Sequence, residues 1–217
     1  MKFEIYSHRH GVELFDTVDE YRTLWSEIQT AIESISEVDL IVDFEERSRK
    51  AIEAGKIPQK SLSYTINDLL KTQLSDRFGW ASQSPIFSND SFADSRDGTW
   101  RLDFAKQSIS VEVAFNHQEA IAHNLIKPVL ASELNHVRKE IQTSAGVVIA
   151  ATAALKAAGG FDPVVGTFEK FKTYLRPYQQ IITVPLVVVG LKAPETFEIT
   201  LEKNGSRLVG FVNRFSA

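Results

Sequence analysis

Two acidic residues on neighbouring short strands carry the clearest chemical signal in this sequence. Segment 100–115, WRLDFAKQSISVEVAF, alternates apolar and polar side chains on either side of Gln107-Ser108. A two-residue turn there pairs residues whose numbers add up to 215, as 107 and 108 do, and places Asp103 opposite Glu112. Two carboxylates with Cβ atoms about 5 Å apart repel each other, and a divalent cation compensates the repulsion. The pair is therefore a candidate Mg²⁺ site, since Mg²⁺ takes carboxylate, phosphate and water oxygens.

The same register predicts which side chains share a face of this hairpin. The face expected toward the core carries Leu102, Phe104, Val111, Val113 and Phe115. The opposite face carries Arg101, Asp103, Ser110, Glu112 and Ala114. Two alternatives to a metal site stay open: a solvated acidic face, and an acid/base pair acting on a sugar. No aromatic stretch suited to sugar binding lies beside either acid, which disfavours the sugar alternative.

Composition excludes several other classes of protein. The chain has 217 residues, of which 43% are hydrophobic and 24% charged, a balance typical of one globular domain. It contains no cysteine, which excludes disulfides, thiolate zinc sites and cysteine nucleophiles. Neither a membrane-spanning apolar run nor a secretion signal is evident. We therefore expect a soluble cytoplasmic protein.

The net charge of −4 decides nothing about partners, because the charge is unevenly distributed. Residues 1–50 hold 6 basic and 12 acidic side chains, whereas the remaining residues hold 18 basic and 16 acidic ones. A local basic surface for nucleic acid is compatible with this distribution.

Periodicity predicts a single α/β domain over residues 1–217, with a mixed sheet flanked by helices. Expected strands are 2–6, 100–106, 109–115, 147–150 and 184–191. Expected helices are 18–35, 65–78, 118–137 (kinked or begun at Pro128), 153–158 and 167–175. A hairpin is expected around Asn204-Gly205 within about residues 196–213. Residues 38–44 fit either a strand or the start of the charged helix 45–54, and residues 81–99 predict a long loop.

The hairpin, with its Asp-x8-Glu spacing in LDFAKQSISVEVAF, resembles the active-site hairpin of the BglII/BstYI group of type II restriction endonucleases, members of the PD-(D/E)xK nuclease fold. Three further segments resemble the same group. They are FEIYSHRHGVELF with the following LWSEIQTAIESI, then YTINDLLKTQLSDRFGW, and VPLVVVGL. The resemblance covers most of residues 1–191 in patches and implies a restriction-endonuclease-like fold.

The resemblance also implies a function. It implies a homodimer that uses Mg²⁺ to hydrolyse phosphodiester bonds at a short palindromic site in double-stranded DNA, with Asp103 and Glu112 as metal-binding acids. The third position of the motif is Lys in the wider superfamily and often Gln in this group, but here it is Ala114. Alanine neither binds metal nor polarises water, so its role has moved to another residue or cleavage is lost. His117 and Arg101 are the candidate replacements, and the alternative is a cleavage-defective DNA-binding protein that keeps the nuclease fold.

DNA contacts are expected from two sources. The turn after the catalytic strand approaches the groove in the resembled group, which implies Asn116 and His117 as contacts, and asparagine suits adenine. Basic side chains are candidate phosphate contacts, against the alternative that each is a solvated residue of a helix. They are Lys127, Arg138, Lys139, Lys170, Lys172 and Arg176.

Other polar residues are secondary candidates for the metal shell. One of Asn89, Asp90, Asp94 and Asp97 in the predicted loop, or a glutamate at 45–46, could complete it. A metal pair of His8 and His10 lacks further ligands nearby in sequence, so we expect His8 to be structural or a DNA contact. Trp80 and Trp100 are better explained by core packing than by base stacking.

Overall fold

A six-stranded mixed sheet organises the chain. The computed structural model describes residues 1–88, 100–133 and 137–215. The sheet order is β1-β6-β5-β4-β3-β2, with β4, β5 and β6 parallel and the outer pairings antiparallel. The strands are β1 (Phe3–His8), β2 (Ala81–Pro85), β3 (Arg101–Lys106), β4 (Ile109–Ala114), β5 (Ala145–Ala151) and β6 (Leu186–Leu191).

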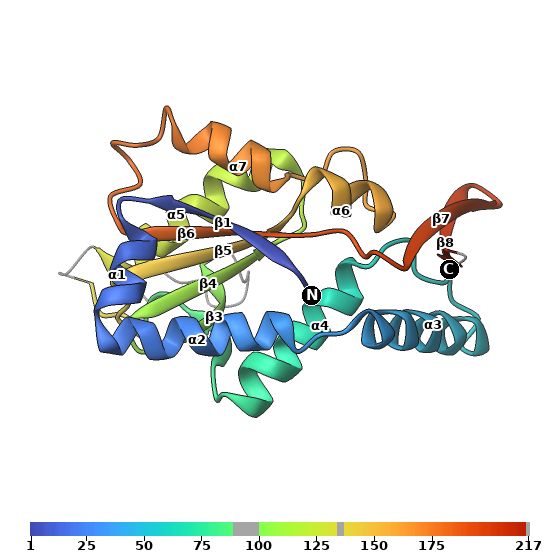
Figure 1. Cartoon of the computed structure of the whole chain (residues 1–217), viewed down its shortest axis with the longest axis horizontal. Helices are drawn as coiled ribbons and strands as arrows, with labels where there is room; N and C mark the ends of the chain where they lie inside the picture. Colours follow the sequence, from blue (N-terminus) through green and yellow to red (C-terminus); the bar gives the residue numbers. More distant parts are fainter. Residues whose placement is uncertain (89–99, 134–136, 216–217) are drawn as a thin grey trace.

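Helices cover both faces of this sheet (Figure 1). They are α1 (Gly11–Thr17), α2 (Asp19–Glu33), α3 (Glu37–Glu53), α4 (Ser63–Lys71) with a π-helix (Thr72–Arg77), α5 (Ile121–Ser132), α6 (Ala153–Ala158) and α7 (Phe168–Leu175). The side chains of α1, α2 and α4 form the larger apolar core on one face, and those of α5 and α7 form a second core on the other. Strands β5 and β6 are buried along their whole length, as continuous apolar runs predict. The predicted α/β class is confirmed.

A separate hairpin closes the end of the molecule beside α3. Strands β7 (Phe197–Asn204) and β8 (Arg207–Arg214) pair with each other around Asn204-Gly205, as predicted, and form their own two-stranded sheet. Residues 37–53 form one helix, which settles the ambiguity at 38–44. Ser36 and Asp39 make a reciprocal capping box at its start.

Two expected boundaries and the expected packing of one side chain are wrong. The segment 81–99 begins with the edge strand β2 instead of a loop, and Gln83 within it has a φ of 51°. The helix expected over 118–137 ends at Ser132, and Pro128 lies inside it instead of starting it. Finally, the sequence predicts Leu102 in the same core as Phe104, which lies in the apolar core that α2 covers. Leu102 instead packs in a third apolar cluster with Ala105. The β3–β4 ladder ends at the Phe104–Val111 pair, so Leu102 lies beyond it.

The register of the β3–β4 hairpin agrees with the prediction. Phe104 pairs with Val111, Ala105 with Ser110 and Lys106 with Ile109, all of which sum to 215. The face that carries Glu112 is not solvated, however, because α5 covers it and buries Ser110, Glu112 and Ala114.

Gly146 on β5 lets α5 approach the sheet closely. A Cβ atom at this glycine would lie 2.6 Å from Cβ of Pro128, well inside van der Waals contact. The absent side chain therefore sets how near Pro128, and with it Lys127, comes to the strands. Among the described residues, every helix is too short or too polar to span a bilayer.

We expect Gly146→Ala to destabilise the fold, because α5 must move away from β5 to make room for a methyl group. Overpacking of this kind costs about 1–3 kcal/mol. In a chain of this size each kcal/mol lowers the melting temperature by about 2–4 °C. Thermal unfolding followed by circular dichroism measures the change, and an unaltered melting temperature would contradict the close packing of Gly146 on Pro128.

Candidate active site

Asp103 lies where the β3–β4 ladder ends, and its carboxylate takes over a backbone hydrogen bond. Its Oδ2 accepts a hydrogen bond from the backbone N–H of Val113 at 2.7 Å, and its Oδ1 accepts one from the Gln83 side chain at 3.1 Å. The carboxylate is partly exposed and lines a cavity of about 250 Å³ between α4, β2 and β3. It is thus held in a fixed orientation while it faces an open space.

Glu112 is enclosed almost completely, with 1% of its surface exposed. Its Oε2 accepts a hydrogen bond from Nζ of Lys127 on α5 at 2.7 Å, and the lysine side chain itself is only 12% exposed. The other oxygen, Oε1, is buried and has no hydrogen-bond partner in the structure. A buried carboxylate oxygen without a partner is costly and points to a ligand that satisfies it.

The surroundings of Glu112 disfavour its charged form. Burial, together with the nearby charge of Asp103, raises the pKa of Glu112 to about 8, and Lys127 acts in the opposite direction. Asp103 and Glu112 are the residues directly beyond Phe104 and Val111, the last pair of the β3–β4 ladder.

Both acids fit a divalent cation. Together they supply two oxygen donors, one of which lacks any other partner, and Mg²⁺ needs only one or two protein carboxylates when water and phosphate complete its shell. Within residues 1–88, 100–133 and 137–215, no third His, Asp or Glu joins them as a cluster. The candidate ligands Asn89, Asp90, Asp94 and Asp97 lie outside the described residues.

An open groove continues from Asp103 toward the end of β4. A second cavity of about 920 Å³ shares Asn67 and Val113 with the cavity at Asp103 and extends over Asn116 to Arg207 on the C-terminal hairpin. Asn116 and His117 are both exposed at this end of β4. Asn116 Oδ1 accepts a hydrogen bond from the Asn124 side chain at 3.0 Å, which leaves its amide N–H groups available. The arrangement brings Asp103 and Asn116 to adjoining cavities, whereas Glu112 lines neither of them and is enclosed between β4 and α5.

Comparison with known proteins identifies the family. The model of the restriction endonuclease family BglII/BglIII matches residues 3–191. This chain belongs to that family. The fold agrees: the crystal structure of restriction endonuclease BglII complexed with a DNA 16-mer matches with a TM-score of 0.63 and 17% identity, over 99% of this chain and 91% of that chain. Free BglII matches with a TM-score of 0.56 and 16% identity, over 99% and 100% of the two chains. A comparison with curated protein sequences finds no match.

As a member of this family the protein is a type II site-specific deoxyribonuclease.

The third position of the motif, Ala114, lies in an apolar environment in the structure. Ala114 is 1% exposed and packs with Ile121 and Leu125. Arg101, a candidate replacement, donates to the backbone carbonyl of Gln83 at 2.9 Å, and His117 lies at the start of a short 3-10 helix.

The basic side chains of the endonuclease fall into two groups. Arg138, Lys170 and Arg176 are exposed, as phosphate contacts require. Lys139 is instead 8% exposed, donates to the carbonyl of Leu130 and lies 4.6 Å from the ring centre of Phe87, while burial lowers its pKa.

Lys172 is half-buried over Phe168 and Tyr6. Lys127, expected on a helix surface, is the partner of Glu112. Sequence reasoning missed this second role because an acid on a strand and a lysine fifteen residues later show no local signal for contact.

Several secondary candidates are structural. His8 is buried and its Nε2 lies 2.8 Å from the carbonyl of Ile182, and burial lowers its pKa. Trp80 is buried and donates to Glu27, which also pairs with Lys106, so this lysine is engaged away from the acid pair. Glu45 faces Arg214 at 3.7 Å and Glu46 pairs with Lys50 at 2.7 Å, so both glutamates belong to a salt-bridged surface of α3.

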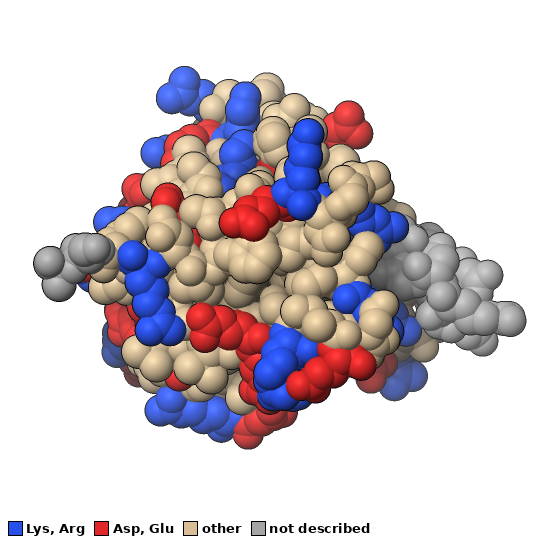
Figure 2. All heavy atoms as spheres, turned by 90° about the vertical axis from the view of Figure 1, so that its right-hand side faces the viewer, with Lys and Arg blue, Asp and Glu red and all other residues tan. Residues whose placement is uncertain are grey.

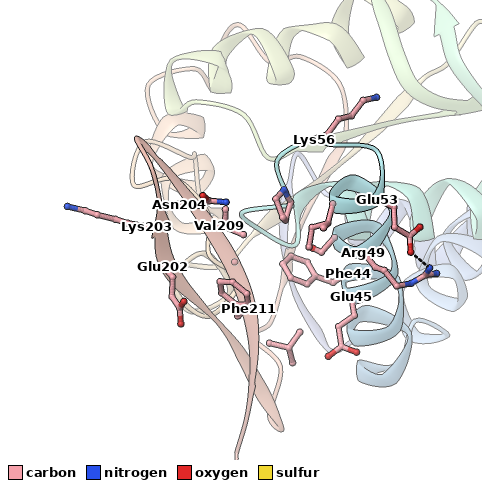
Figure 3. Close-up of a pocket in the computed structure, with 15 residues that line it drawn as sticks. Phe44, Glu45, Arg49, Glu53, Lys56, Glu202, Lys203, Asn204, Val209 and Phe211 are labelled. Atoms are coloured by element: carbon pink, nitrogen blue, oxygen red, sulfur yellow. Dashed lines mark hydrogen bonds and ion pairs between the residues drawn. The ribbon is translucent and has the colours of Figure 1, made fainter.

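A groove between α3 and the C-terminal hairpin has no catalytic grouping. It has a volume of about 850 Å³, and Phe44, Val209 and Phe211 line its apolar floor (Figure 3). Arg49 and Glu53 form an ion pair on its rim (Figure 3). Charges of both signs are interspersed over this end of the molecule (Figure 2), without a continuous basic field.

Because Glu112 is held in a site that disfavours its charge, we expect Glu112→Gln to raise stability in metal-free protein. The folded wild type binds more protons than the unfolded chain between the ordinary pKa of 4.5 and about 8, so its stability falls as pH rises through this interval. Glutamine has no carboxyl group to ionise, so the variant does not lose stability in this pH interval. The melting temperature of the variant in EDTA should therefore exceed that of the wild type by at least about 3 °C above pH 8. The difference should shrink toward pH 4.5.

Glu119→Gln, which neutralises an exposed glutamate, is the matched control and should leave the melting temperature unchanged at every pH. A Glu112→Gln protein that melts below the wild type at all pH values would contradict this account, since it would make the buried charge a net contributor to stability.

Proposed function

We propose that this deoxyribonuclease is a homodimer that uses Mg²⁺, held by Asp103 and Glu112, to hydrolyse phosphodiester bonds within a short palindromic site in double-stranded DNA. We further propose that residues 1–217 form one nuclease domain and that the enzyme acts in the cytoplasm. The observation that carries the proposal is the buried, unpartnered Oε1 of Glu112 beside the oriented carboxylate of Asp103.

Each of the two acids is held in place by its own hydrogen-bond donors, so both suit one rigid site. The N–H of Val113 and the Gln83 side chain orient Asp103 at the cavity, and Lys127 fixes one oxygen of Glu112 from the opposite side. Ligands locked by such contacts lose little freedom when they bind a metal. When bound, Mg²⁺ lowers the pKa of water and neutralises charge that develops on the phosphate.

Recognition of the DNA sequence is proposed for Asn116 and His117, which are exposed beyond the end of β4. Asn116 lines the groove that leads from Asp103. An asparagine amide can donate to N7 and accept from N6 of adenine in the major groove. Arg138, Lys170 and Arg176 are exposed cations that suit phosphate contacts and give no sequence preference by themselves.

A palindromic site follows from a two-fold homodimer, since each protomer then meets the same half-site. The bound DNA 16-mer of the structurally similar BglII supports DNA as the substrate. Ala114 favours the alternative of a cleavage-defective DNA-binding protein, and cleavage itself separates the two.

We expect the wild-type protein to cut a long unmodified DNA into discrete fragments in Mg²⁺, and to leave it intact in EDTA. Asp103→Asn and Glu112→Gln each remove a carboxylate ligand and should lower the cleavage rate by at least about 1,000-fold. Gel electrophoresis of the digests measures the rate, and mapping of the fragment ends gives the recognition site.

Asp76→Asn is the control, because Asp76 is an exposed acid on the π-helix and its loss should leave the fragment pattern unchanged. Cutting by both site variants at the wild-type rate would overturn the assignment of the acids. Binding of unmodified DNA without any cleavage would establish the cleavage-defective alternative.

We expect Asn116→Ala to weaken binding to the mapped site by at least about tenfold, because a lost base contact costs about 1–3 kcal/mol. Binding to unrelated DNA should change by less than about twofold, since phosphate contacts persist. Titrations of both DNAs in EDTA measure this, with the exposed neighbour Gln118→Ala as the control. An equal loss on both DNAs would contradict a role of Asn116 in base recognition.

A further inference from the structure

The third position of the catalytic strand is filled by an apolar side chain in a packed environment. Ala114 follows Glu112 on the same face of β4 and contacts the apolar residues of α5. A polar group that acts on the acid pair must therefore come from another element. The structure offers one on α5.

Lys127 reaches this position from the helix that covers the face. Its Nζ lies 2.7 Å from Oε2 of Glu112, and the pair is 12% and 2% exposed. Pro128, the next residue, packs directly against Gly146, so the helix is held close to the sheet at this point. The ammonium group therefore stays beside Glu112 because of backbone packing as well as charge.

We propose that Lys127 is a positioning residue of the catalytic centre and provides, from α5, the cation that Ala114 cannot provide from β4. The proposal rests on the proposed function. By holding Oε2, the lysine fixes the rotamer of Glu112 and leaves Oε1, which has no other partner, for the metal.

The charge balance gives the lysine a second effect on the reaction. With Glu112 ionised, as a metal ligand must be, two carboxylates and one ammonium carry a single net negative charge, and a bound divalent cation would change it to a single net positive charge. Lys127 would thus add to the attraction of the centre for the phosphodiester and for the additional negative charge of the transition state. Without Lys127 the metal-loaded centre would be neutral.

The alternative is a buried ion pair that only supports the fold, and such pairs contribute little net stability. The two roles differ in what restores cleavage. A positioning cation can be replaced by another cation at the same place, whereas the loss of a purely structural contact should slow cleavage only in variants that also melt earlier. When Lys127 is removed, metal affinity should fall together with cleavage, because Glu112 loses the contact that fixes its rotamer.

The test compares Lys127→Met, Lys127→Arg, Lys127→Ala and the double variant Ala114→Lys/Lys127→Ala with the wild type. Three quantities are measured: the single-turnover cleavage rate, the Mn²⁺ affinity of DNA-free protein by calorimetry, and the DNA affinity in EDTA. Lys203→Met, on the exposed C-terminal hairpin, is the control. Thermal unfolding checks that each variant is folded.

We expect Lys127→Met to cleave at least about 100-fold more slowly, the usual loss when one preorganised donor is removed. It should bind Mn²⁺ at least about threefold more weakly, because Glu112 loses the contact that fixes its rotamer. Its DNA affinity in EDTA should match that of the wild type. Lys127→Arg keeps the charge and should retain at least about a tenth of the rate. The double variant should exceed Lys127→Ala by at least about tenfold, because the lysine returns to the strand.

Cleavage by Lys127→Met at the wild-type rate would overturn the proposal, as would slower cleavage with an unchanged Mn²⁺ affinity. Where Lys127→Met does not fold, equal inactivity of Lys127→Arg and of the double variant at wild-type melting temperatures would overturn it. A wild type that never cleaves overturns the proposed function itself. A wild type that cleaves beside a fully active Lys127→Met overturns only the role of the lysine.

Discussion

The candidate site depends on a carboxylate that is buried against its own preference for water. Glu112 lies between the sheet and α5, where desolvation and the charge of Asp103 oppose its ionisation, while Lys127 and the backbone N–H of Asp103 favour it. A fold that holds such a group gives up stability, because charges are far better solvated in water. The sheet and its two helical layers provide the packing that keeps the carboxylate in place, and a bound cation would offset much of the cost.

The close packing of α5 on β5 determines where Lys127 lies relative to Glu112. Gly146 on β5 has no side chain, Pro128 packs on it, and the neighbouring Lys127 reaches Glu112. The same parallel core strands that define the α/β fold thus set the distance between an acid on β4 and an ammonium on α5. A catalytic strand with alanine at its third position is compatible with cleavage under this arrangement, because the cation arrives from the helical layer.

Much of this arrangement was predictable from the sequence because the relevant interactions are local. Alternating polarity and a two-residue turn gave the register of the β3–β4 hairpin, and the Asn-Gly turn gave the C-terminal hairpin. The expectations that failed depend on contacts between distant segments. The edge strand β2 forms because β3 offers it a partner, and the face of Glu112 is buried because α5 covers it.

The sequence by itself determined the fold class, the register of the β3–β4 hairpin and the family resemblance, since spacing and periodicity are properties of adjacent residues. Only the tertiary structure decided that Lys127 is the partner of Glu112 and that Lys139 and His8 are interior. It also decided that an oxygen of Glu112 lacks a hydrogen bond. Burial and side-chain contact across the sheet depend on how the helices pack, and the packing of distant segments leaves no periodic trace in the chain.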